Sequence, residues 1–163
     1  MERIRPIGTP LPRRACWGAA LAVLMAPSLA HATLGHAYDS VVADRAHMAA
    51  RMSSTRMSTH TVHALETPGG GMVREFAGAD GQVFAVAWRG PGRPDLRQLL
   101  GERFDTLQAD NARRPRLRRT PMTVSRDDFV VRTGGHPGAF WGVAYLPRQL
   151  PAGFSGQDFA GTP

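Results

Sequence analysis

A short basic run is the feature of this sequence that most directly suggests binding chemistry. Residues 113–119 contain five arginines: Arg113, Arg114, Arg116, Arg118 and Arg119. Guanidinium groups pair bidentately with phosphate and carboxylate, so the run is a candidate site for a polyanion such as an acidic polysaccharide. The alternative is a solvated connector that Pro115 and charge repulsion keep extended. Nucleic acid is not favoured as a partner, because no aromatic residues stand between the arginines to stack on bases.

One histidine and two tryptophans are further candidates. His136 lies in a Gly-Gly-His-Pro-Gly turn, where an exposed imidazole suits general-base chemistry near neutral pH. It is equally consistent with an ordinary turn residue. Trp88 and Trp141 occupy alternating strand positions, from which they would either line a ligand groove or fill the core of a sheet.

The composition excludes several enzyme classes. All 20 basic residues are arginine, so the chain has no Walker A lysine, Schiff-base lysine or Ser-x-x-Lys pair. Its single cysteine is Cys16, close to the N-terminus. His60 and His63 open a predicted strand and should point to opposite faces, which does not suit a shared metal. We therefore predict no cofactor, no metal and no catalytic set.

Residues 1–32 are predicted to be a secretory signal peptide. Arginines precede an apolar stretch at residues 15–26, Pro27 follows, and Ala30-His31-Ala32 supplies the small-x-small motif of signal peptidase. The apolar stretch is shorter than the roughly 20 residues that span a bilayer. We expect cleavage after Ala32, a periplasmic or secreted location, and no transmembrane segment in the processed chain.

The net charge of +7 is unevenly distributed. Residues 1–32 carry +3, which leaves +4 after cleavage, while residues 113–119 alone carry +5. The rest of the processed chain is nearly neutral, so we expect any affinity for anions to be confined to the basic run.

The segment 33–58 is predicted to contain a helix from about Val41 to Met52, followed by a linker at Ser53–Thr59. Ser40 is placed to cap this helix. Charged positions such as Asp44 and Arg45 predict that it docks loosely at the periphery.

Short β-type runs with glycine-rich turns follow, and they predict an antiparallel meander. The expected strands are Thr61–Glu66, Met72–Ala77, Gln82–Trp88, Met122–Ser125, Asp128–Thr133 and Ala139–Leu146. In the third of them, strict alternation places Phe84, Val86 and Trp88 on one face. The opposite face carries only small residues in its centre and should lie under a helix.

The covering helix is predicted to begin after Asp95, with an apolar stripe at helical spacing. The stripe consists of Leu96, Leu99, Leu100, Phe104 and Leu107. Asp95 and Gln98 resemble a capping box, and Gly101 falls inside the helix. The whole predicts an α+β domain at residues 59–151, with a mostly antiparallel sheet, one helix across a face, a peripheral N-terminal helix, and a coil tail at 152–163.

Several strings resemble an exported proteobacterial family of unknown function, number 2844. They are Val73-Arg74-Glu75-Phe76, Val83–Trp88 with Gly90-Pro91, Pro94-Asp95-Leu96 with Leu99-Leu100-Gly101, and Gly134-Gly135-His136 with Leu146-Pro147. The resemblance covers about residues 34–151. It implies export and a compact domain, and it assigns no activity, cofactor or catalytic residue.

These observations favour a non-catalytic binding or accessory module of the bacterial cell envelope. The expected partner is an anionic envelope polymer or another envelope protein. Two alternatives stay open: a small periplasmic hydrolase with His136 in its site, and a structural protein that self-associates through Asp39–Met57.

Overall fold

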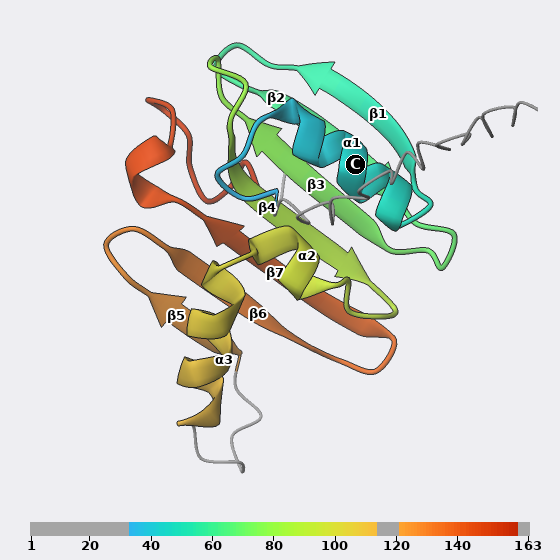
Figure 1. Ribbon diagram of the computed structural model, residues 1–163, viewed down its shortest axis with the longest axis vertical. Coiled ribbons are helices and arrows are strands. Elements are labelled where there is room, and N and C mark those ends of the chain that lie inside the picture. The colour runs from blue at the N-terminus through green and yellow to red at the C-terminus, as the bar shows by residue number, and fades with distance from the viewer. Residues whose placement is uncertain (1–32, 114–120, 160–163) are drawn as a thin grey trace, which may run out of the picture.

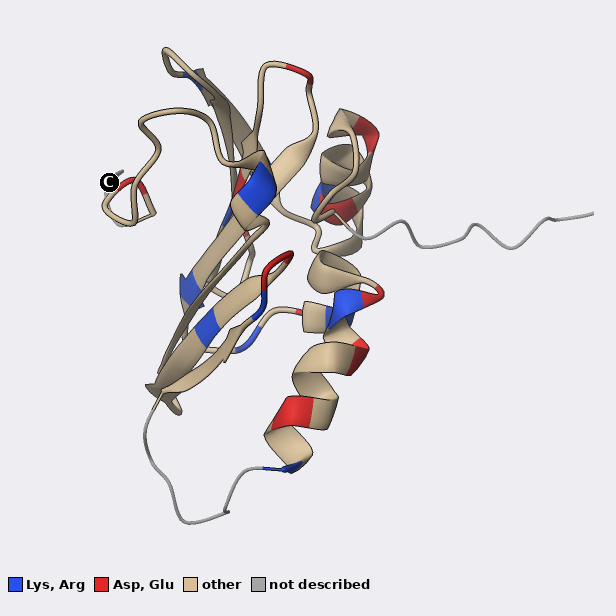
Figure 2. Cartoon of the chain, turned by 90° about the vertical axis from the view of Figure 1, so that its left-hand side faces the viewer, with Lys and Arg blue, Asp and Glu red and all other residues tan. Residues whose placement is uncertain are grey.

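A computed structural model describes residues 33–113 and 121–159, which form one sheet with helices on one face (Figure 1). The sheet has seven strands in the order β1-β2-β3-β4-β7-β6-β5, and every pairing is antiparallel. The predicted α+β class is confirmed. The side view shows the helices on one side of the sheet and the C-terminal segment on the other (Figure 2).

Most strands lie where the sequence places them. The strands are β1 (Arg51–Arg56), β2 (Thr61–Glu66), β3 (Met72–Ala77), β4 (Val83–Gly90), β5 (Met122–Ser125), β6 (Val130–His136) and β7 (Ala139–Tyr145). The helices are α1 (Tyr38–His47), α2 (Leu96–Leu100), α3 (Arg103–Ala112) and the 3-10 helix η1 (Pro147–Gln149).

The sheet consists of two meanders joined in its middle. Strands β1 to β4 follow one another in chain order, and β5 to β7 form a second set. The two sets meet where β4 pairs with β7, with Trp88 opposite Gly142 and Ala87 opposite Val143. Helices α2 and α3 connect the sets and cross the helix-covered face (Figure 1).

The prediction for residues 41–59 is wrong in two respects. The helix ends at His47, and residues predicted as its last turn and as a linker form strand β1 at the sheet edge. Ala49 adopts a positive φ of 48°, which reverses the chain between the two elements. Five of the six β1 residues are exposed, so the strand carries no alternation that sequence reasoning can detect.

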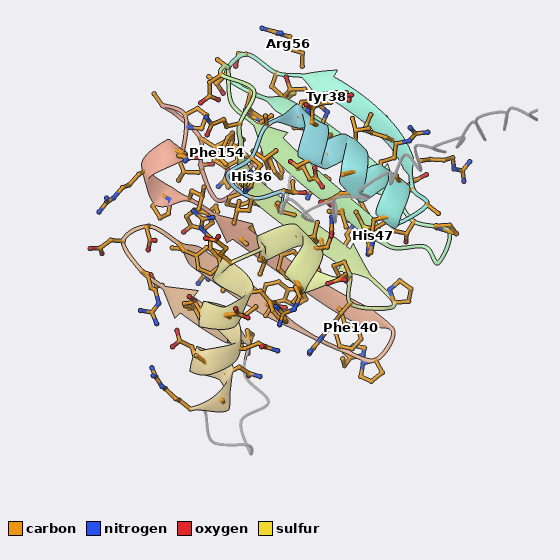
Figure 3. The ribbon with its side chains drawn as sticks, in the orientation of Figure 1. His36, Tyr38, His47, Arg56, Phe140 and Phe154 are labelled. Carbon is orange, nitrogen blue, oxygen red and sulfur yellow. The ribbon has the colours of Figure 1, made fainter. Side chains whose placement is uncertain are left out.

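Helix α1 is also not peripheral. Val41 is fully buried in the helix-side core, and Asp44, one of the charged positions that favoured loose docking, is buried as well. Tyr38 at the start of α1 packs against the His63 ring of β2, with the centroids 5.1 Å apart (Figure 3).

The predicted long helix is divided in two by Gly101. This glycine ends α2 with φ 56° and ψ −130°, and α3 begins two residues later. Asp95 caps α2 as expected, accepting from the Arg97 and Gln98 amides at 2.9 and 3.1 Å. The Gln98 side chain does not return to the cap, however, because its amide donates to Asp44 at 2.6 Å.

A bulge corrects the face assignment of β4. Phe76 pairs with Ala85 but Ala77 pairs with Val83, so Phe84 is an extra residue in β4. Val83, Val86 and Trp88 consequently face the helices, whereas Phe84 lies with Ala85 and Ala87 on the other side. The helices therefore cover the face with the larger residues, opposite to our expectation.

Each face of the sheet has its own apolar cluster. The helix-side core is the larger and includes Leu65, Val73, Leu99 and Leu100. On the opposite face, Phe76 and Phe84 meet the C-terminal segment, with the Phe84 and Phe154 rings 4.9 Å apart at 85°. The described part of the tail thus packs on the sheet although it has no helix or strand after η1.

No helix in the described part of the chain is long and apolar enough to cross a bilayer.

The closest approach between the two meanders generates a stability prediction. A Cβ at Gly142 would lie 2.1 Å from the Trp88 ring, so Gly142→Ala must displace that ring within the core. We expect the free energy of unfolding to fall by about 1–3 kcal/mol in urea titrations. Gly92→Ala is the matched control, because nothing lies within 4 Å of its Cβ position. Equal stability of the two variants would contradict this packing.

Candidate functional site

The face of the sheet without helices, here called the open face, carries arginines from three strands. Arg74 of β3, Ala87 of β4, Val143 of β7 and Arg132 of β6 form one cross-strand row. The two arginines at its ends are roughly 14 Å apart, which is three strand spacings. Arg89 lies two residues along β4 from Ala87, directly opposite Trp141. Figure 2 shows arginines as blue segments along the strands of the sheet.

These arginines border a groove of about 690 Å³, here called the open-face groove. Its apolar lining comes from Met72, Trp141, Val143, Tyr145 and Phe159. Among the described residues, no Asp or Glu lines it. A volume in this range and a mostly apolar lining with a few convergent charged groups are typical of ligand sites.

Arg74 forms the buried end of the groove. It is 9% exposed, donates to the Phe159 carbonyl, and lies over the Phe76 ring at 5.9 Å from the centroid. Burial lowers the pKa of Arg74, and the positive charge of Arg89 lowers it further. Arg74 therefore holds the C-terminal segment against the sheet and adds positive charge to the groove.

Arg89 and Arg132 are the groups that a ligand would meet. Both are exposed, and neither has an ion-pair partner within residues 33–113 and 121–159. Guanidinium groups without a carboxylate partner are available to pair with an incoming anion.

A second hollow continues the groove toward the hairpin between β6 and β7. It also measures about 690 Å³ and shares Met72, Arg89 and Trp141 with the first. Arg51 and Phe140 line its outer part, and Arg93 lies over the Phe140 ring at 4.8 Å from the centroid. The two hollows together fit an elongated ligand better than a compact one.

The structure separates the two tryptophans that the sequence selected. Trp141 is 41% exposed in the groove. Trp88 is 3% exposed, because its ring packs over Gly142 in the helix-side core. Both border the groove, but Trp141 is the one whose ring a ligand can reach.

His136 ends β6 at an exposed hairpin. Its Nδ1 donates to the carbonyl of Pro137 at 2.9 Å. No contact with a carboxylate is found for His136 among the described residues, so the structure assembles no acid–base pair around it. The hydrolase alternative gains no support from this geometry.

Only the first residue of the basic run is described. Arg113 follows α3 and lies 3.6 Å from the Asp110 carboxylate of the preceding turn. Arg114, Arg116, Arg118 and Arg119 lie outside the described residues, and their proposed role with polyanions stays a prediction.

Sequence reasoning missed a row of polar residues beneath α1. Ser54, His63 and Glu75 lie opposite one another on β1, β2 and β3, and Ser54 Oγ is 2.8 Å from His63 Nδ1. The residue types match a Ser-His-acid triad, but the chemistry does not. Burial lowers the pKa of His63, and Glu75 makes no hydrogen bond to it that would orient the ring.

The groove arginines were missed for a topological reason. Arg74, Arg89 and Arg132 are isolated in sequence, and they face one groove only because β4 pairs with β7. The available signal is weak: each arginine directly follows a buried apolar residue of its strand, Val73, Trp88 or Val131, so alternation directs it to the opposite face.

Comparison with known proteins adds a family and no function. The family model for DUF2844, a protein of unknown function, matches residues 30–159. The chain belongs to the DUF2844 family. The resemblance seen in the sequence is thereby confirmed at the level of the family. No curated protein and no solved structure matches the chain. Among the described residues, no group of three His, Cys, Asp or Glu side chains is placed to hold a metal.

The charge of the open-face groove predicts how Trp141 is quenched. Because Arg89 lies opposite Trp141, its positive charge should attract iodide and repel caesium. Iodide should therefore quench the fluorescence of Trp141 at least twice as efficiently as caesium, and added salt should reduce the difference. Subtracting the signal of Trp141→Phe isolates Trp141 from the other tryptophans. Arg89→Gln should weaken the preference for iodide, while Arg45→Gln, on the helix side, should leave it unchanged. Equal quenching by both ions would contradict a positively charged groove.

Proposed function

We propose that this DUF2844 protein is an exported, non-catalytic binding module of the bacterial cell envelope, whose open-face groove binds an acidic saccharide. The observation that carries the proposal is the pair Arg89 and Arg132, which have no ion-pair partner among the described residues, beside the exposed ring of Trp141. A sugar ring offers an apolar C–H face that stacks on an aromatic side chain, and its carboxylate or phosphate pairs with guanidinium.

The shape and charge of the site support a chain-like ligand. The two hollows meet at Arg89 and Trp141 and extend from Arg132 toward Arg51. Glu66 is the one acidic residue among the described lining residues of either hollow, and it lies opposite Arg51 on the outer strand. An anionic polymer laid along this path would therefore meet positive charge at its centre.

Binding rather than catalysis fits the groups present. The groove contains guanidinium, aromatic and aliphatic side chains and the hydroxyls of Thr123 and Tyr145, and among its described residues no carboxylate, imidazole or cysteine thiol. A guanidinium stays protonated and does not exchange protons at working pH. A hydroxyl is a weak nucleophile unless an adjacent base activates it, and the described lining residues include no carboxylate or imidazole that would do so.

The self-association alternative receives no specific support. The segment 39–57 is already used within the chain, because α1 packs on the sheet and β1 pairs with β2 along six residues. The outer edge of β1 carries arginines at both ends, and such charges disfavour pairing with a second sheet.

A titration with a carboxylated polysaccharide tests the proposed function. We expect polygalacturonate to bind the purified protein in calorimetry, and its fully methyl-esterified form not to bind. The double variant Arg89→Gln/Arg132→Gln should weaken binding at least tenfold, since each lost charged hydrogen bond costs about 1.5–3 kcal/mol. Trp141→Ala should weaken it as well.

The control variant removes the same charge from the helix side. Arg45→Gln/Arg56→Gln should bind polygalacturonate within twofold of the unmodified protein. An equal loss in both double variants would show that net charge, and not the groove, causes the binding. Identical affinity for the acidic and the esterified polymer would refute recognition of the carboxylate.

A further inference from the structure

Two carboxyl groups are buried together between α1 and the sheet. Asp44 of α1 and Glu75 of β3, here called the acid pair, are both fully buried. Asp44 accepts hydrogen bonds from the Gln98 amide at 2.6 Å and from the Thr33 hydroxyl. No N–H or hydroxyl group of the described residues donates to the Glu75 oxygens, and the Glu75 carboxyl hydrogen-bonds with that of Asp44. Burial, the charge of Asp44 and this hydrogen bond raise the pKa of Glu75 to about 9. Two carboxyl groups buried together without a cation are costly, and the pair therefore requires an explanation.

The cations around the acid pair do not neutralise it. Burial raises the pKa of Asp44, and the charge of the half-exposed His47, which lies 3.7 Å from Asp95, lowers it only in part. His63 of β2 faces Glu75, but burial lowers its pKa and favours its neutral form. Arg103 of α3 donates to the Leu34 carbonyl at 3.3 Å. No ion pair with Asp44 or Glu75 occurs in the described part of the chain.

Thr33 is the residue that touches the acid pair from the N-terminal side. It is fully buried, and the chain just after it is fixed by two hydrogen bonds. The Leu34 amide donates to Leu99 at 3.1 Å, and the Gly35 amide donates to Val83 at 2.7 Å. Since the Thr33 hydroxyl contacts Asp44, covalent geometry keeps the Thr33 main-chain nitrogen within roughly 6 Å of that carboxylate.

Thr33 is also the residue that follows the predicted cleavage site. We propose that the α-ammonium group released at Thr33 by cleavage after Ala32 binds the Asp44–Glu75 acid pair and completes the buried ion cluster of the processed protein. The inference rests on the export part of the proposed function and not on the groove.

The covalent step is a simple hydrolysis. One water adds across the Ala32–Thr33 peptide bond, which leaves a carboxylate on Ala32 and a protonated amine on Thr33. Before cleavage the same nitrogen is a neutral amide with one donor. After cleavage it carries a positive charge and three donors, which matches the charge of Asp44 and the Glu75 oxygens that no described N–H or hydroxyl group reaches.

Cleavage should change the titration of both partners in defined directions. A cation beside the acid pair lowers the pKa of Glu75, and the carboxylates raise the pKa of the amine above its usual 7.7–8.0 or so. For an amine whose pKa is raised on folding, the extra stability is fully present below the unfolded value. It is then lost as the pH rises through the folded value.

The absence of lysine makes this amine measurable by itself. After cleavage, the α-amine is the only primary amine in the chain. The full chain, including residues 1–32, is expressed in a secreting bacterial host, and mass spectrometry identifies its first residue. The rate of acetylation by trace acetic anhydride is then followed against pH, since only the uncharged amine reacts. We expect a midpoint at least one pH unit higher in the folded protein than in urea.

Two variant pairs separate ion pairing from general stability. Asp44→Asn/Glu75→Gln should return the midpoint to the value in urea, whereas Asp39→Asn/Glu66→Gln, which removes two exposed carboxylates, should not move it. Should the first variant fail to fold, one glycine inserted between Ala32 and Thr33 keeps every side chain and moves the ammonium outward. That insertion should lower the thermal midpoint by several degrees at pH 6 and by much less at pH 10.

The outcomes distinguish this inference from the assumption of export. A processed chain that begins at Thr33 with an unshifted amine, or an insertion without effect at pH 6, would overturn the ion cluster and leave export standing. A processed chain that begins at another residue would overturn the ion cluster and leave export standing, whereas a chain that is never cleaved would overturn both.

Discussion

The pairing of β4 with β7 is the contact on which the rest of this molecule depends. It joins two meanders that are separated in sequence by α2 and α3, and it creates one continuous sheet with two distinct faces. The contact is close because Gly142 has no side chain, so that the Trp88 ring can occupy the space where a Cβ would lie. A strand order in which neighbours are remote in sequence is costly in loop entropy, and the dense packing at this junction offsets that cost.

The continuous sheet gives the two faces different roles. The helix-side face has the larger apolar side chains and is covered by α1, α2 and α3. The open face has small residues in the centre of β4, arginines around them, and a C-terminal segment over its far part. The bulge at Phe84 supports this division, because it moves one large aromatic residue out of the helix side to meet Phe154. A groove remains where the open face is uncovered, and its charge comes from the strands and not from a loop.

The N-terminal part of the described chain is bound into this core in two ways. Leu34 and Val41 are buried apolar anchors, while Thr33 and Asp44 bring polar groups to the same place. Gln98 completes a link from α2 to α1, although its spacing from Asp95 suggested a role in the helix cap. The polar residues Thr33, Asp44, Glu75 and Gln98 come from four separate segments of the chain. Only the assembled fold therefore brings them together.

Much of the secondary structure follows from the sequence alone. Glycine-rich turns and β-branched runs located β2, β3 and β5 at their observed bounds, and Asp95 located the start of α2, because these signals are local. Three features were not predictable from the sequence: strand β1, the break at Gly101 and the burial of Asp44. Strand β1 has no hydrophobic period because it is an exposed edge strand, and the burial of Asp44 depends on which elements pack around it. The candidate site was even harder to predict from the sequence. The sequence indicated Trp141 but could not show that it lies beside Arg89 and Arg132. Side-chain alternation tells which residues of one strand share a face, whereas only the pairing of distant strands decides which faces meet.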